Sequence, residues 1–517
     1  MSRLPATAVL LAALGAAAAL GSEPAAGTVA LSPFTIQAGA TAMPAEEGML
    51  FVPENRSNPR SRIIGVHFIR VRGTRQSGAS PILFLPGGPG SFISRANIES
   101  PRNLRELAFL RASGRDVLFV NQRGNPALPL ASNLFWPFSP KPLDRPETVQ
   151  SEGQALREGV QKGQAEWARR GVDLTGYDII NIADDIDDLR QALRYQRVIL
   201  RGGSFGSQWS FAVLKRHPSS VDRALFRGVE PLDYGYDSPK FLWSAVQRVA
   251  AAAEADPGLK PLVPAGGLVE AVKTILTRLE TEPRLVTIAN PKDGTPVRVM
   301  VGRYDLQQVL KYPTAPPYRD NLTRWPRFIL ELYAGDYRYL AATAFQSRTT
   351  PVPTPMLGLL IDNSLGISQE RDALLKAETE QQWIGPVEPI YHATRDLTVT
   401  ARVPDAFRAD APIATPTVLF QGDMDFSTPL ENAVHQAQWL RRGHLTIVHG
   451  GTHSVDDEME QLLPALGAAL QRFLAADSDV EIDAAIKAMP AEATLPAIPF
   501  ETMTGPSLYD RWLKRGS

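Results

Sequence analysis

Residues 198–216 read VILRGGSFGSQWSFAVLKR, in which an apolar run, a glycine-rich turn and a helical pattern follow one another. This order predicts a buried strand, a sharp turn and a helix. The turn has the Gly-x-Ser-x-Gly spacing that holds a serine in strained geometry, with its Oγ above the sheet. Gly202 and Gly206 let the strand and helix approach closely, and the helix N-terminus favours developing negative charge. A chance match is the alternative, but the flanking strand and helix favour Ser204 as a nucleophile.

A second glycine-rich loop, Pro86-Gly87-Gly88-Pro89-Gly90, follows an apolar run at Ile82–Leu85. A tetrahedral acyl intermediate requires two backbone N–H donors aimed at its oxyanion. We expect one donor from Phe205, directly after the serine. Glycine lets a backbone come close to a ligand, so Gly87 or Gly88 is expected to supply the second. The alternative is a tight turn without a role in chemistry.

The serine requires a base, and the base requires a carboxylate that orients it. Among seven histidines, His453 follows a predicted strand on a loop of small residues, which can bring its imidazole over the edge of a sheet. His449, at the end of that strand, is the alternative. For the carboxylate, Asp423 and Asp425 compete in the segment Gly422-Asp423-Met424-Asp425. Asp425 extends further beyond the strand, so we predict Asp425 as the partner of His453.

Strand and helix patterns alternate along most of the chain, which predicts an α/β fold with a mostly parallel sheet and helices on both faces. Predicted strands cover 63–71, 81–85, 116–121, 197–201, 224–229, 416–421 and 445–449, and predicted helices include 178–194, 429–442 and 458–475. Between 236 and 404 the pattern becomes mainly helical, with helices expected at 241–255, 267–280, 322–345 and 368–383. We interpret this stretch as a helical cap inserted between two strands. The core would then comprise residues 46–235 and 405–480, followed by a C-terminal extension at 481–517.

The N-terminus has the pattern of a secretory signal peptide over residues 1–22. Arg3 precedes an apolar run from Leu4 to Leu20, and small residues follow at Gly21 and Ser22. An uncleaved membrane anchor is the alternative. Residues 23–45 are rich in alanine, glycine and proline and are expected to form a flexible leader. We therefore predict an exported protein, periplasmic or extracellular, without stable membrane insertion after cleavage.

Composition limits the possible functions. There is no cysteine, which excludes a cysteine nucleophile, a disulfide and a thiolate metal site. Basic and acidic residues number 54 and 55, so no electrostatic feature indicates a nucleic-acid partner. Four aspartates between 184 and 188 lie on one predicted helix and are interpreted as a solvated face rather than a metal site. Trp325 and Trp383 are interpreted as packing residues of the cap rather than the walls of a pocket.

Arg201 places a charge on a central strand three residues before Ser204, and a buried charge requires a partner. Glu230, at the end of the next predicted strand, is the candidate. We expect this pair at the rim of the pocket, where Glu230 could receive a substrate ammonium group.

Six segments together resemble the prolyl and tripeptidyl aminopeptidase group of the α/β-hydrolases. They are residues 52–59 (VPENRSNP), 86–90 (PGGPG), 121–124 (NQRG), 203–206 (GSFG), 422–425 (GDMD) with Thr428-Pro429, and 451–453 (GTH). The resemblance implies the α/β-hydrolase fold, Ser204 as nucleophile with Asp425 and His453 as partners, and a cap over the site. The chain order Ser, Asp, His is also that of α/β-hydrolases.

The residues and the resemblance predict a serine hydrolase that works through an acyl-enzyme, without metal or organic cofactor. We expect an aminopeptidase acting on short peptides. An esterase, lactonase or amidase for small apolar molecules is the alternative, because the same residues serve all these reactions. A binding protein on a hydrolase scaffold is a further alternative. Oligomeric state is not indicated by the sequence.

Overall fold

The computed structural model describes residues 24–75, 78–124, 135–136, 140–311, 318–350, 354–387 and 389–516. The predicted signal peptide lies outside these residues. A ten-stranded sheet forms the centre, in the order β1-β2-β3-β5-β4-β7-β8-β12-β13-β14. Its strands are β1 (Val29–Ala38), β2 (Thr41–Pro53), β3 (Ile63–Val71), β4 (Ile82–Leu85), β5 (Val117–Val120), β7 (Val198–Gly203), β8 (Val221–Arg227), β12 (Thr417–Gly422), β13 (Gly443–His449) and β14 (Glu492–Thr494).

The strands from β5 to β14 in this order run parallel to one another, whereas β1, β2 and β3 are antiparallel to their neighbours. Each of the seven strands predicted from apolar runs is present. In β7, Val198 and Leu200 enter the hydrophobic core on one face and Ile199 enters the core on the other. Burial on both faces explains why the central strands are continuous apolar runs.

The expectation of a flexible leader at residues 23–45 is wrong. Residues 29–53 form the antiparallel pair β1–β2 at the edge of the sheet, and Val29 pairs with Leu50. The side chains of β1 are mostly exposed. An edge strand with one solvated face needs few apolar residues, so its sequence does not resemble that of a buried strand.

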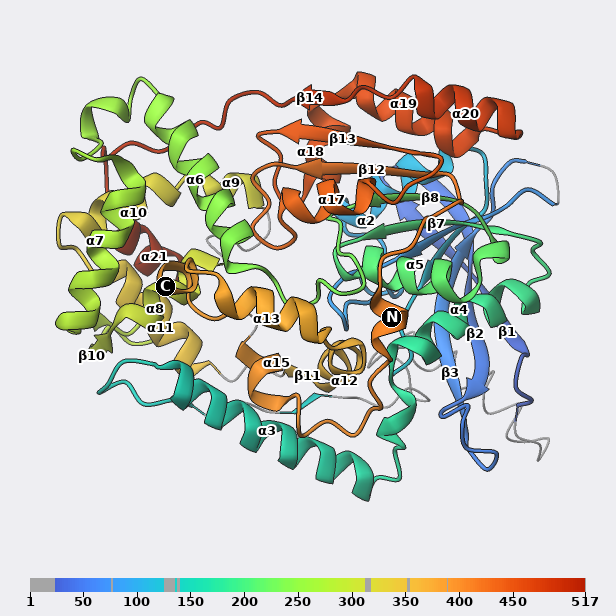
Figure 1. Ribbon diagram of the computed structural model, residues 1–517, viewed down its shortest axis with the longest axis horizontal. Helices are drawn as coiled ribbons and strands as arrows, with labels where there is room; N and C mark the ends of the chain where they lie inside the picture. Colours follow the sequence, from blue (N-terminus) through green and yellow to red (C-terminus); the bar gives the residue numbers. More distant parts are fainter. Residues whose placement is uncertain are drawn as a thin grey trace, which may run out of the picture.

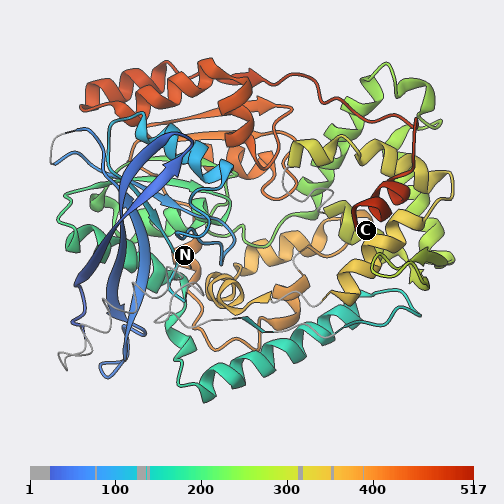
Figure 2. The ribbon, with the colours of Figure 1, turned by 180° about the vertical axis from the view of Figure 1, so that it is seen from behind.

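Helices cover both faces of the sheet (Figures 1 and 2). The core on one face includes side chains of α3, α4, α5 and α17, and the core on the other includes those of α2, α18, α19 and α20. The predicted helix at 458–475 is two helices, because Pro464 begins a new one. The helices that cover the two faces of the sheet are α2 (Pro101–Arg111), α3 (Val149–Arg169), α4 (Ile179–Ala192), α5 (Phe205–Arg216), α17 (Leu430–Ala437), α18 (Val455–Leu462), α19 (Pro464–Ala475) and α20 (Asp479–Lys487).

The segment between β8 and β12 is mainly helical and lies beside the sheet (Figure 1). Its helices are α6 (Pro239–Ala255), α7 (Gly267–Thr281), α8 (Arg303–Lys311), α9 (Tyr318–Leu322), α10 (Trp325–Tyr333), α11 (Arg338–Thr349), α12 (Met356–Leu365), α13 (Gln369–Ala377), α14 (Gln381–Ile384), α15 (Pro389–Thr394) and α16 (Asp405–Arg408). It also contains an antiparallel pair, β9 (Arg284–Ala289) and β10 (Pro296–Val301), within the stretch predicted to be mainly helical. A second short pair joins β6 (Phe135–Trp136) to β11 (Thr354–Pro355).

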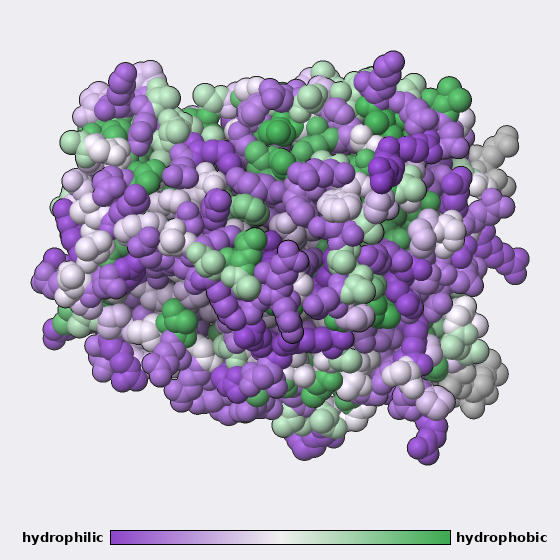
Figure 3. All heavy atoms as spheres, viewed as in Figure 1, coloured by the Kyte–Doolittle hydropathy of each residue, from purple (hydrophilic) through white to green (hydrophobic). Residues whose placement is uncertain are grey.

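The cap has a hydrophobic core of its own, to which later parts of the chain contribute. Leu508 and Tyr509 of α21 (Leu508–Gly516) belong to it, so the C-terminal residues lie within the cap (Figure 1). The Tyr509 hydroxyl accepts a hydrogen bond of 2.7 Å from the backbone N–H of Ala289. The face of the molecule in Figure 3 is mainly hydrophilic, with scattered hydrophobic residues. Among the described residues, no helix is both long enough and apolar enough to cross a membrane.

Candidate active site

Ser204 lies at the turn between β7 and α5, with φ 58° and ψ −137°. A positive φ is strained for a residue other than glycine, and the surrounding contacts maintain it. The Ser204 N–H donates to the carbonyl of Gly228 at 2.9 Å. A Cβ on residue 206 would lie 2.1 Å from the carbonyl oxygen of Leu85, and a Cβ on residue 202 would lie 2.3 Å from the carbonyl oxygen of Gly206. The two flanking glycines therefore allow a packing that any larger residue would obstruct.

His453 and Asp425 form a buried pair. His453 Nδ1 lies 2.9 Å from Asp425 Oδ2 and 3.0 Å from Asp425 Oδ1. Asp425 is completely buried, and the exposed fraction of His453 is 8%. Each residue lies on a loop that follows a parallel strand, β12 for Asp425 and β13 for His453, so both reach the same edge of the sheet.

Several donors fix the Asp425 carboxylate. Its Oδ1 accepts from the backbone N–H groups of Ser427 at 2.8 Å and Thr428 at 2.9 Å. Its Oδ2 accepts from the Thr428 hydroxyl at 2.8 Å and the Gln421 amide at 3.0 Å. Burial alone raises the pKa of Asp425, but the charge and hydrogen bond of His453 and the two N–H donors outweigh burial, so the pKa lies below its usual value. Asp425 is therefore held as an ionised acceptor.

Ser204 and His453 line the same cavity, which has a volume of about 470 Å³. Their proximity is also seen at Gly228. A Cβ there would lie 3.1 Å from His453 Cε1 and 3.2 Å from the Ser204 nitrogen. The structure thus brings together the three residues of the predicted triad: Ser204 and His453 on the cavity wall, and Asp425 behind His453.

The predicted oxyanion residues lie in the same place. A Cβ on Gly87 would lie 3.1 Å from Ser204 Cβ, and both Gly87 and Gly88 line the cavity. Phe205 is the first residue of α5, where backbone N–H groups have no partner within the helix. The loop that contains Gly87 is also packed against the cap, because a Cβ on Gly358 of α12 would lie 3.1 Å from the carbonyl oxygen of Pro89.

The two alternative candidates pair with each other. His449 Nδ1 lies 3.0 Å from Asp423 Oδ2, and Asp423 also accepts from the backbone N–H of Gly450 at 2.8 Å. Neither is among the described residues that line the cavity of Ser204. This pair ties β13 to the loop after β12.

The expected pair of Arg201 and Glu230 is wrong. Arg201, with an exposed fraction of 1%, contacts Glu106 of α2 at 3.0 Å and Asp456 of α18 at 3.4 Å. Its carboxylate partners therefore come from two helices that cover the sheet, α2 and α18. Glu230 is not among the described residues that line the cavity. The role of Glu230 in binding a substrate ammonium group stays a prediction.

Sequence reasoning also missed Glu106, Arg227 and Asp456, which line the cavity together with Ser204 and His453. The available signal was weak: Arg227 is a charged residue within the predicted strand 224–229, and Asp456 comes three residues after His453.

The interpretation of the four aspartates as a solvated face is wrong for Asp187, which is buried, and for Asp185, which is almost completely buried. Its Oδ1 contacts Arg56 at 2.5 Å and Arg123 at 2.6 Å. Arg56 and Arg123 come from two of the segments that carry the family resemblance, and the contacts show that both arginines tie the sheet to α4. In the described part of the chain, no group of side chains has the composition of a metal site.

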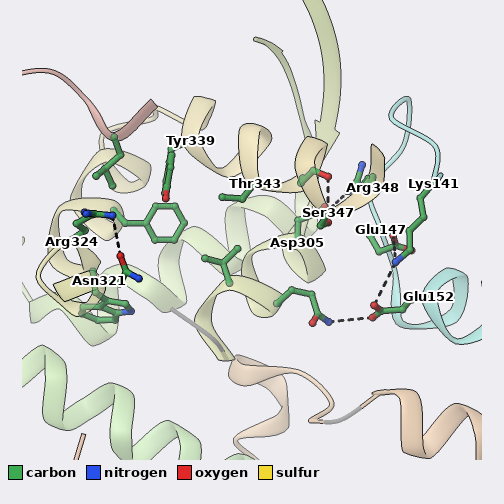
Figure 4. Close-up of a pocket in the computed structure, with 16 residues that line it drawn as sticks. Lys141, Glu147, Glu152, Asp305, Asn321, Arg324, Tyr339, Thr343, Ser347 and Arg348 are labelled. Atoms are coloured by element: carbon green, nitrogen blue, oxygen red, sulfur yellow. Dashed lines mark hydrogen bonds and ion pairs between the residues drawn. The ribbon is translucent and has the colours of Figure 1, made fainter. Parts of the chain in front are cut away.

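A second cavity, of about 400 Å³, lies between helices of the cap and residues 141–152 (Figure 4). One end holds Lys141 between Glu147, at 3.1 Å, and Glu152, at 3.5 Å. The other end holds Arg324, whose Nη1 donates to Asn321 at 3.1 Å. Trp325 is buried in the cap core, as predicted, and it also lines this cavity. Trp383 stacks on Trp243, with ring centroids 6.4 Å apart, as packing requires.

The loop of Asp425 is anchored in the cap. Met424 and Phe426, on either side of Asp425, both belong to the hydrophobic core of the cap. The position of the carboxylate therefore depends on the cap as well as on the sheet.

Comparison with known proteins identifies the fold family. The profile of the alpha/beta hydrolase fold family matches residues 80–458. No curated protein matches the sequence.

The solved structures that match the chain are distant in sequence. A serine hydrolase from Cycloclasticus zankles is 14% identical, with 86% of this chain and 98% of that chain covered and a TM-score of 0.32. The proline iminopeptidase-related protein of Thermus thermophilus is 16% identical, with 85% and 99% covered and a TM-score of 0.35. A bromoperoxidase from Bacillus anthracis is 12% identical, with 83% and 100% covered and a TM-score of 0.34. Similarities this distant carry no information about reaction or substrate.

Proposed function

Because the chain belongs to the alpha/beta hydrolase fold family and is an enzyme of that family, we propose that Ser204, His453 and Asp425 are its catalytic triad. The observation that carries this proposal is the contact of 2.9 Å between His453 Nδ1 and Asp425, in a site where His453 shares a cavity with a serine at positive φ. Asp425 fixes the tautomer in which His453 Nε2 carries no proton and can accept one.

The reaction is acyl transfer. Ser204 Oγ attacks a substrate carbonyl while His453 accepts the hydroxyl proton. The N–H of Phe205 and that of Gly87 or Gly88 stabilise the oxyanion, and the loss of one such donor costs about 3 kcal/mol. His453 then protonates the leaving group, and water hydrolyses the acyl-enzyme. The chain's own residues supply every group that these steps require.

For the substrate, we propose a short peptide from which the enzyme releases N-terminal residues. The six segments that resemble prolyl and tripeptidyl aminopeptidases support this proposal. The cavity supports it as well, since the side chains of Asn97, Arg102 and Asn103 line it, and polar walls suit a peptide better than a long acyl chain. An esterase, lactonase or amidase is the second candidate, because Phe84, Phe92 and Ile93 give the same cavity an apolar side.

One set of substrates separates the candidates. Prolyl and alanyl arylamides, their N-blocked forms and short p-nitrophenyl esters would be compared, with Ser204→Ala as the control. Faster hydrolysis of the free-amine arylamides supports the aminopeptidase, and turnover of esters alone supports the esterase. Absence of both, together with no labelling of Ser204 by a fluorophosphonate, would show a binding protein and reject the triad.

We also propose that the protein is exported to the periplasm or beyond the cell, because residues 1–22 have the pattern of a signal peptide. N-terminal sequencing of the protein from fractionated cells tests this. An N-terminus near Ser22 in the exported fraction supports cleavage, and an intact N-terminus in the cytoplasmic fraction contradicts it.

A further inference from the structure

Arg227 hydrogen-bonds to the main chain of both Ser204 and His453. It is the last residue of β8, and its carbonyl oxygen accepts from the Ser204 N–H at 3.2 Å. At the other end of the residue, Nη1 of the buried guanidinium donates to the carbonyl oxygen of His453 at 3.0 Å. Arg227 therefore spans the distance between the two residues that must meet during catalysis.

The guanidinium also packs beneath the nucleophile turn. A Cβ on Gly203 would lie 2.5 Å from Arg227 Nε and 2.7 Å from Arg227 Cζ. Glycine at 203 is thus the residue that leaves room for the guanidinium directly before Ser204. This contact accounts for the second glycine of Gly202-Gly203-Ser204, which the nucleophile motif itself leaves free.

Asp456 fixes the orientation of Arg227. Its Oδ2 accepts from Arg227 Nε at 2.9 Å, and Asp456 lies in the first turn of α18, three residues after His453. Burial acts to raise the pKa of Asp456, but the charges of Arg227 and Arg201 outweigh it, so the pKa lies well below its usual range. Arg201 and Glu106 complete a buried group of two guanidinium and two carboxylate groups.

We propose that Arg227, oriented by Asp456, is a positioning residue that holds Ser204 and His453 at the separation required for proton transfer. The inference rests on the proposed triad. It assigns the buried charge group a role in catalysis, because its four members come from α2, β7, β8 and α18, which carry or adjoin the residues of the site. A displacement of about 1 Å between reacting groups costs about a hundredfold in rate, so the rate depends strongly on this separation.

The test is the rate at which a fluorophosphonate labels Ser204, because labelling requires the nucleophile and its base but no natural substrate. In Arg227→Met, which keeps an unbranched apolar side chain but removes the guanidinium, we expect the limiting rate of labelling to fall about a hundredfold with the half-saturating concentration unchanged. Arg227→Lys should restore part of this rate, because an ammonium group can replace one of the two hydrogen bonds. Asp456→Asn should reduce the rate in the same way.

Arg223→Met is the matched control. Arg223 is also buried on β8, four residues earlier, and its guanidinium donates to the carbonyl oxygens of Phe473 and Ala476 instead. Its loss removes a buried arginine without touching the site, so the folded variant should be labelled at the wild-type rate. Thermal unfolding of each variant shows whether it is folded.

Labelling of Arg227→Met at the wild-type rate, or equal losses in Arg227→Met and Arg223→Met, would overturn the positioning role. If Arg227→Met does not fold, the labelling rates of Arg227→Lys and Asp456→Asn test the proposal instead. Wild-type labelling rates in both variants would overturn the positioning role. Failure of the wild-type enzyme to react at all would instead reject the proposed triad.

Discussion

Replacement of Asp425 by asparagine tests the arrangement of the site most directly. The two oxygens of Asp425 have different neighbours: Oδ1 faces the fixed N–H groups of Ser427 and Thr428, whereas Oδ2 faces the Gln421 amide and the Thr428 hydroxyl. The asparagine oxygen must take the place of Oδ1, because backbone donors cannot turn. Its NH2 group then takes the place of Oδ2 and points at His453 Nδ1.

This geometry determines the size of the effect. A donor opposite Nδ1 makes that nitrogen the acceptor and moves the imidazole proton to Nε2, so His453 can no longer accept the proton of Ser204. The loss of rate for a base held in the wrong tautomer is about 10⁴-fold. At 1.36 kcal/mol for each factor of ten, this corresponds to about 5 kcal/mol in activation free energy. The Thr428 hydroxyl can reorient, but the Gln421 amide cannot, because its Oε1 accepts from the backbone N–H of Val229 at 2.9 Å and its Nε2 donates to the carbonyl oxygen of Thr428 at 2.8 Å. We therefore expect some loss of stability as well, about 1–3 kcal/mol for the unpaired amide.

The measurement is the rate of fluorophosphonate labelling of Asp425→Asn, with thermal unfolding to confirm the fold. Asp423→Asn is the control, because it makes the same substitution two residues earlier in a carboxylate that pairs with His449. We expect a near wild-type rate from the control. A loss of less than tenfold in folded Asp425→Asn, or an equal loss in both variants, would refute the tautomer argument.

Three further predictions follow from buried contacts. Gly206→Ala would place a Cβ 2.1 Å from the Leu85 carbonyl oxygen, so we expect a loss of about 3 kcal/mol in urea denaturation, and wild-type stability would contradict this packing. Asp185→Asn leaves Arg123 buried without its carboxylate, so the free energy of unfolding should fall by about 3–5 kcal/mol. The fluorophosphonate should still label the folded variant at the wild-type rate, and a loss of labelling in folded protein would place Asp185 in the site. Burial and nearby carboxylates raise the pKa of Glu460 to about 8 from an ordinary 4.5. The folded protein therefore binds this proton more tightly than the unfolded chain does, so the free energy of unfolding falls as the pH rises between these two values. Glu460→Gln should therefore reduce the difference in melting temperature between about pH 5 and pH 8.5, and an unchanged difference would show that Glu460 does not titrate in this range.

The sequence was most informative where burial and chemistry agree. The central strands are covered on both faces, so their apolar runs appear directly in the sequence, as at Val198–Gly203. The predicted triad residues follow three of these strands, and the parallel arrangement brings the ends of parallel strands to one edge of the sheet. The nucleophile motif identified one residue, and the topology indicated where its partners could lie.

Other features depend on contacts that no local pattern encodes. Arg201 clearly required a carboxylate, but its partners Glu106 and Asp456 lie 95 and 255 positions away in the chain. Glu230 was merely the carboxylate that follows the neighbouring predicted strand. Strand β1 is solvated and lacks an apolar run. The alternating residues of Arg284–Ala289 lie among helices and were interpreted as part of a helical region.

Met424 and Phe426 set a limit on any smaller version of this enzyme. Both side chains pack within the cap, on either side of Asp425. Deletion of residues 236–404 would expose these two large apolar side chains to water and remove the contacts that support the loop between them. A minimal enzyme built on this sheet would therefore need a substitute surface for these two side chains before it needed any change to the triad itself.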